Sequence, residues 1–93
     1  ENIDCSFSPS DDAMSVKIEL TLPHVGKREV MMIEYEQPNH WVSLSSSLRS
    51  GDILTAQARV NRTSGPIVSM ERSKLRITVV SSDASVDIGN CSK

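Results

Sequence analysis

Apolar and polar residues alternate along most of this chain of 93 residues, and this alternation constrains the fold more than any other feature. The clearest segment is AMSVKIELTL, residues 13–22, where every second residue from Met14 to Leu22 is apolar and the residues between them are polar. A strand places successive side chains on opposite faces, so this pattern predicts a strand with one buried face. No stretch of ten or more residues follows the 3.6-residue period of an amphipathic helix.

Further segments of this kind are separated by turn signals such as Pro23, Gly26 and Gly51, and together they predict an all-β protein. Because aromatic residues are scarce, the core is expected to be aliphatic. The expected strands are residues 2–7, 13–22, 28–37, 40–48, 52–60, 74–80 and 86–91. The alternation predicts that the following side chains are buried: Val16, Ile18, Leu20, Leu22, Ile33, Leu54, Val60, Leu75, Ile77 and Val79.

The expected strand 28–37 departs from strict alternation. Met31 and Ile33 form one apolar face, while Val30 and Met32 add apolar character to the other. Both faces of this strand therefore carry apolar side chains.

Cys5 and Cys91 are the only cysteines and lie close to opposite ends of the sequence. The first and last segments of a compact domain are often close in space, so a Cys5–Cys91 disulfide is expected. On the chain-entropy model, closing a loop of that length stabilises the fold by up to ~4–5 kcal/mol. The alternative is a pair of buried, reduced thiols. The disulfide predicts an oxidising compartment, meaning the periplasm, the cell surface or a secreted fluid, and a mature chain from which a signal peptide has been removed.

The segment SLRSGDILTAQARV, residues 47–60, is similar to the part of OB-fold domains that precedes the fourth strand, where a Leu, a Gly-Asp turn and an alternating strand recur. The segment VDIGNC, residues 86–91, resembles the terminal strand of small exported bacterial OB-fold domains. The chain departs from the pattern at Ala58, where many OB domains have a glycine that lets the barrel bend. The matching residues are Leu48, Gly51, Asp52, Ile53, Val60, Val86, Ile88 and Cys91.

The length predicts one domain, residues 1–93, closed by the terminal disulfide. The resemblance implies a small OB-like barrel of five to seven strands. An immunoglobulin-like β-sandwich is the alternative, because several short strands at regular spacing fit either architecture. The position of the cysteines favours the barrel, since the intersheet bridge of an immunoglobulin domain usually joins strands from the middle of the chain.

The sequence lacks the motifs of common catalytic and metal sites. His24 and His40 are the only imidazoles, and neither belongs to an H-x-x-H or C-x-x-C pattern. No serine lies in a G-x-S-x-G motif, and the glycines are too scattered for a phosphate-binding loop. Glu34 and Glu36 share a strand face, where paired carboxylates are usually solvated. We therefore expect no enzymatic activity, no cofactor and no bound metal.

Basic residues form the first candidate partner-binding group. Arg59 and Arg62 come from one expected strand and its turn, while Arg72, Lys74 and Arg76 come from the next strand and its approach. If these two strands pair, the side chains form a basic ladder that fits an acidic partner. The alternative is a set of solvated strand faces, with cross-strand partners such as Glu34 or Glu36.

Tyr35 and Trp41 form the second candidate group, on either side of the segment EQPNH. A tryptophan near a loop can anchor a protein contact. The alternative is a position in the core or at its edge.

Two segments fit the sequon for N-linked glycosylation: Asn61 begins the sequence NRT, and Asn90 begins NCS. In a bacterial protein both would stay unmodified, and a bonded Cys91 disfavours a glycan at Asn90.

The formal net charge is −2, so the chain has no bulk positive field that attracts nucleic acid, and it lacks the stacking platforms of OB-fold nucleic-acid binders. No apolar run approaches the ~18–20 residues of a transmembrane helix. We expect a non-catalytic interaction module of the cell envelope or secreted space that binds a protein partner. The alternatives are a secreted inhibitor or immunity-type protein, and a carbohydrate- or oligonucleotide-binding OB-like module.

Overall fold

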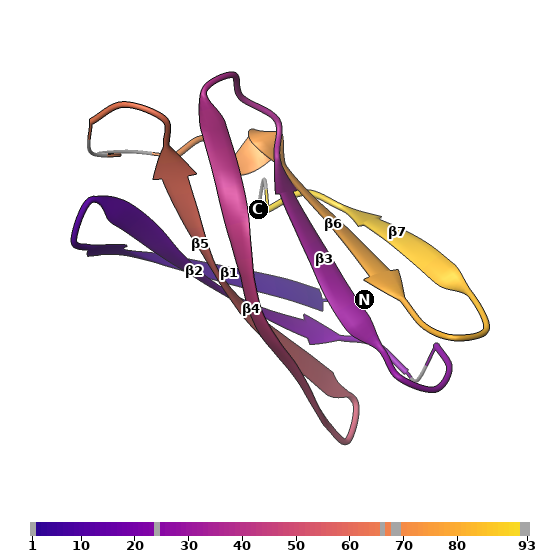
Figure 1. Cartoon of the computed structure of the whole chain (residues 1–93). Helices are drawn as coiled ribbons and strands as arrows, with labels where there is room; N and C mark the ends of the chain where they lie inside the picture. Colours follow the sequence, from indigo (N-terminus) through magenta and orange to yellow (C-terminus); the bar gives the residue numbers. More distant parts are fainter. Residues whose placement is uncertain (1, 24, 66, 68–69, 92–93) are drawn as a thin grey trace.

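The computed structural model describes residues 2–23, 25–65, 67 and 70–91. These residues form seven β-strands and one short 3-10 turn at Arg72–Lys74 (Figure 1). The strands are β1 (Asn2–Ser10), β2 (Ala13–Thr21), β3 (Val30–Tyr35), β4 (His40–Ser50), β5 (Ile53–Arg62), β6 (Leu75–Val80) and β7 (Ser85–Gly89). The expectation of an all-β protein is confirmed.

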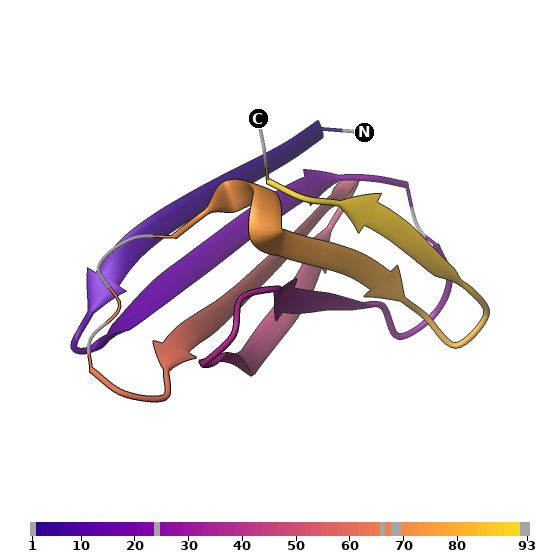
Figure 2. The same cartoon turned by 90° about the horizontal axis from the view of Figure 1, so that it is seen from above.

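The strands form two antiparallel sheets that pack face to face as two layers (Figure 2). The four-stranded sheet has the order β1-β2-β5-β4, and the three-stranded sheet has the order β3-β6-β7. The chain passes between the sheets after β2, β3 and β5. Seven strands in this order have the arrangement of a constant-type immunoglobulin sandwich, which is the alternative that the strand spacing left open.

The described residues do not form the closed barrel that the OB resemblance implied. The first strand, β1, pairs with β2, and the last strand, β7, pairs with β6, so the two ends of the chain lie in different sheets. The Gly51-Asp52 turn that carried the resemblance forms the two-residue loop of the β4–β5 hairpin, since Ser50 pairs with Ile53. Gly51 has a φ of 60°, which suits the first position of such a loop. This hairpin is common to many antiparallel proteins and therefore does not specify a barrel.

The core lies between the two sheets and is aliphatic, as expected. All of the side chains that the alternation placed inside are buried. At most 1% of the surface is exposed for Ile18, Leu20, Val60, Ile77 and Val79. Met31 is also fully buried. The alternation succeeds because each sheet has one face against the core and one face in solvent.

The β1–β2 hairpin has a tight turn. Strand β1 continues to Ser10, which pairs with Ala13 across a two-residue turn. Asp11 occupies the first turn position with a φ of 55°, a left-handed conformation that Asp adopts more readily than most residues. The hairpin therefore holds β1 against β2 along its full length.

A partly buried ion pair closes one end of the sandwich. Arg49, at the end of β4, donates through Nε and Nη2 to the two carboxylate oxygens of Glu29, at 2.8 and 2.6 Å. The side chains of Arg49 and Glu29 are 13% and 4% exposed. Arg49 also donates to the carbonyl of Leu22, and Glu29 accepts from the N–H of Val25. The pair therefore holds the β2–β3 connection against the end of β4.

Candidate functional site

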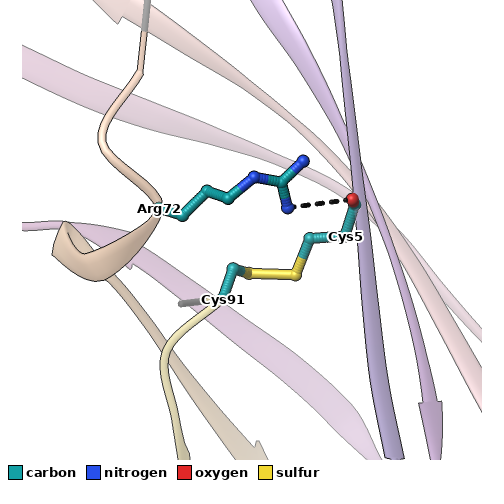
Figure 3. The surroundings of a disulfide bond; sticks show 3 residues. All are labelled: Cys5, Arg72 and Cys91. Carbon is teal, nitrogen blue, oxygen red and sulfur yellow. Dashed lines mark hydrogen bonds between the residues drawn. A yellow bond between two sulfur atoms is a disulfide. The ribbon is translucent and has the colours of Figure 1, made fainter. Parts of the chain in front are cut away.

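The disulfide joins the two sheets at one lateral edge of the sandwich. Cys5 on β1 and Cys91, which follows β7, are bonded, with their Cα atoms 6.1 Å apart (Figure 3). The two cysteines are 9% and 1% exposed. The expected pairing is therefore present. It connects β1, an edge strand of the four-stranded sheet, to the segment after β7, an edge strand of the three-stranded sheet.

Arg72 covers this disulfide and contacts both sheets. Its Nη1 donates to the carbonyl oxygen of Cys5 at 3.2 Å (Figure 3). Its own carbonyl accepts from the N–H of Cys91 at 3.3 Å. The guanidinium lies 4.5 Å from the centre of the Phe7 ring, which is the geometry of a cation–π contact. Arg72 therefore has a structural role that the basic pattern of the sequence did not reveal.

The other basic candidate residues do not form one ladder with Arg72. Arg59 and Arg62 lie on β5 in the four-stranded sheet, whereas Arg76 lies on β6 in the three-stranded sheet, so the strand pairing that the ladder required is absent. Arg59 donates to the carbonyl of Ser10 at 3.3 Å. Lys74 is exposed in the 3-10 turn, and Arg62 is also exposed.

Arg76 instead belongs to a charged cluster with Glu36 and Asp87. Its guanidinium lies 2.9 Å from the Asp87 carboxylate on β7 and 3.8 Å from that of Glu36, which follows β3. All three side chains are about half exposed. A shallow hollow of about 210 Å³ lies beside this charged cluster, and Ser73 and Asn90 contribute to its wall. The carboxylates on either side of Arg76 give this end of the sheet a net negative character.

An apolar patch lies on the same sheet, next to the charged cluster. Val30 and Val80 face each other across the β3–β6 pair, and Met32 follows two residues along β3. These side chains point away from the core and are 37%, 37% and 45% exposed. In the register Thr78 lies between Met32 and Asp87, so the apolar patch and the charged cluster form one continuous outer face. The apolar character of Val30 and Met32 in the sequence was the signal for this surface.

Tyr35 and Trp41 lie in different sheets and do not form one aromatic site. The Tyr35 hydroxyl accepts from the N–H of Glu71 at 3.0 Å, and the ring meets His40 edge-on with centroids 5.2 Å apart. Tyr35 is half-buried and has a packing role. Trp41 lies on β4, where it pairs with Asn61 of β5 and is 54% exposed. It therefore remains available for contact.

The outer face of the four-stranded sheet is polar on β1 and β2, whereas Trp41, Leu48 and Ile53 are exposed apolar side chains on β4 and β5. A shallow hollow of about 260 Å³ has a mixed lining of polar and apolar residues: Ser6, Phe7, Ser8, Ser15, Val16, Lys17 and Gln57. Within the described residues, no three His, Cys, Asp or Glu side chains come together as a metal site. The described part of the chain also contains no helix with the length and apolarity needed to cross a membrane. Of the two histidines, His40 donates from Nδ1 to the carbonyl of Pro38 at 2.9 Å, and His24 lies outside the described residues.

The comparisons with protein families, with curated proteins and with solved structures find no match to this chain. The fold and the candidate surfaces are therefore interpreted from the chain's own residues.

Proposed function

We propose that this protein is a non-catalytic module that binds a protein partner in an oxidising compartment, through the outer face of the three-stranded sheet. The observation that carries the proposal is the apolar patch of Val30, Met32 and Val80 beside the charged cluster of Glu36, Arg76 and Asp87. An exposed apolar patch with a polar rim is typical of a protein interaction site.

Burial of this patch alone does not supply the affinity of a stable complex, so a partner must also contact the surface around it. Complete burial of a Val or Met side chain contributes about 1.5–3 kcal/mol, and each of these three is already more than half buried. The patch alone therefore contributes roughly 2–4 kcal/mol, whereas micromolar affinity requires about 8 kcal/mol. The charged cluster and its neighbouring hollow supply polar contacts of the kind that surround an apolar centre.

The charges on this face favour a protein over a nucleic acid. Among the described residues, Glu34, Glu36 and Asp87 carry three negative charges around Arg76, and Lys74, whose carbonyl accepts from the N–H of Glu36, adds a second positive charge at the end of this face. Such a surface repels phosphate groups and suits a partner that presents Lys or Arg next to apolar side chains. The Cys5–Cys91 disulfide supports a location in the periplasm, at the cell surface or in a secreted fluid.

Photo-crosslinking tests the proposal. A photoreactive residue replaces Met32 in one form of the protein and Lys17, on the outer face of the other sheet, in a second form. We expect only the first form to give a discrete adduct with a protein from the native compartment. Identification of that adduct also tests the secreted-inhibitor alternative, which requires the partner to be an enzyme whose activity the module blocks.

Substitution of the same positions supplies the second arm of the test. Met32→Glu is expected to lower partner affinity at least tenfold, because a carboxylate is desolvated in the interface, and to leave the melting temperature within a few degrees of the parent. Lys17→Glu is the matched control and should leave affinity unchanged. A loss that follows Lys17→Glu rather than Met32→Glu would contradict the proposal and favour carbohydrate binding in the hollow beside Lys17, which both polar and apolar side chains line.

A further inference from the structure

The sequon at Asn61 lies at the end of a strand, on the outer face of the four-stranded sheet. Val60 points into the core and is fully buried, so Asn61, the next residue of β5, points to the other side. Asn61 lies one residue beyond the last pair between β5 and β2, which joins Met14 to Val60. Thr63, the third residue of the sequon, is exposed. Asn61 itself is only partly exposed, so its amide lies at the surface beside its neighbours, on a face that the core does not use.

Trp41 lies directly opposite Asn61 in the β4–β5 pair. Side chains of directly paired residues point to the same face with their Cβ atoms about 4.5–5.5 Å apart. Trp41 is 54% exposed, which leaves a large apolar ring in solvent next to the Asn61 amide. A group attached to that amide therefore begins within reach of the indole.

We propose that, in the secretory pathway of a eukaryotic cell, Asn61 carries an N-linked oligosaccharide and that its first sugar packs against the indole of Trp41. In the transfer step, Nδ2 of Asn61 forms a bond to C1 of the first sugar of a polyprenyl diphosphate-linked oligosaccharide. The C1–O bond to the diphosphate breaks, the lipid diphosphate leaves with its electron pair, and the amide loses one proton to a base of the transferase. No electrons are exchanged with an external oxidant or reductant.

The second sequon, at Asn90, is in a different situation. Asn90 precedes Cys91, which is 1% exposed, bonded to Cys5 and hydrogen-bonded through its N–H to the Arg72 carbonyl. Once the disulfide forms, the chain on this side is held against β1 and the 3-10 turn (Figure 3). Ser92, the third residue of that sequon, lies outside the described residues. The structure therefore favours modification at Asn61 over Asn90.

The glycan and the proposed partner surface lie on different sheets. Asn61 and Trp41 belong to the four-stranded sheet, whereas the apolar patch belongs to the three-stranded sheet. A glycan at Asn61 covers an exposed indole and leaves the apolar patch free. This inference does not depend on the identity of the protein partner.

Secretion of the full chain from a eukaryotic cell line, behind a cleavable leader, tests whether Asn61 is modified. We expect a glycosylated product whose mass falls on treatment with peptide-N-glycosidase, with Asn61 converted to Asp in the released peptide. Asn61→Gln and Thr63→Ala should each abolish the modification, whereas Thr63→Ser and Asn90→Gln should retain it. A secreted, disulfide-bonded chain without glycan, or with glycan at Asn90 alone, would overturn the proposal.

Fluorescence tests the contact with Trp41, which is the only tryptophan of the chain. We expect acrylamide to quench the glycosylated protein at least twofold less efficiently than either the enzymatically deglycosylated protein or Asn61→Gln. Trimming the glycan to its first sugar should retain most of this protection, because the first sugar makes the contact. Equal quenching of all four forms would show that the sugar does not pack on the indole and would overturn that part of the proposal.

Discussion

Among single residues, Arg72 most directly connects charge to folding. Its guanidinium hydrogen-bonds to Cys5 and covers the Phe7 ring, so Arg72→Ala should lower the free energy of unfolding by about 1–2 kcal/mol. Arg59→Ala is the control, because the Arg59–Asp11 pair is 4.0 Å long with Asp11 92% exposed, and its effect should stay within about 0.5 kcal/mol. Denaturant titration of both variants measures the two changes in the free energy of unfolding. Equal small losses would mean that Arg72 is only a solvated surface cation.

At the scale of elements, the Arg49–Glu29 pair fixes the β2–β3 connection to the end of β4. Glu29→Gln removes the negative charge but keeps the shape, and leaves the Arg49 guanidinium largely buried without its counter-ion. We expect a loss of about 1–3 kcal/mol in the free energy of unfolding, because the guanidinium loses its carboxylate partner in a site that is only partly exposed to solvent. Glu19→Gln, at an exposed position of β2, is the matched control and should change stability little. A loss of similar small size in both variants would show that the pair is not needed to hold this end.

The same elements show which parts of the fold were predictable from sequence. The strands and the buried faces followed from the alternation, because a strand's two faces are decided by its own residues and their neighbours. The pairing of the strands could not be predicted in this way. The alternation in residues 52–60 and 74–80 is the same whether these two strands pair or lie in different sheets. For this reason the prediction of a basic ladder was wrong. The Arg49–Glu29 pair carried no signal, since its members are 20 positions apart and no local pattern links them.

At the scale of the whole molecule, the two sheets are joined differently at their two lateral edges. On one side β3 lies against β4, and the N–H of Met31 donates to Oγ of Ser47 at 3.1 Å. On the other side the Cys5–Cys91 disulfide and Arg72 join β1 to the segment after β7. In the described part of the chain no strand ladder connects the sheets at either edge, so the edge at β1 depends on this covalent bond and on Arg72.

This dependence makes reduction of the disulfide the most informative test of the whole fold. The bond joins residues 86 positions apart, and its removal should lower the free energy of unfolding by about 2–4 kcal/mol, which corresponds to a fall in melting temperature on the order of 10–20 °C. Free-thiol titration of the denatured, unreduced protein first establishes that the bond is present. In the reduced protein, Arg72→Ala should cost less than in the oxidised protein, because Arg72 contacts the carbonyl of Cys5 and the N–H of Cys91, whose relative positions the bond fixes. An unchanged melting temperature after complete reduction would show that β1 and β7 are held by their sheets alone, and that the disulfide and Arg72 act independently.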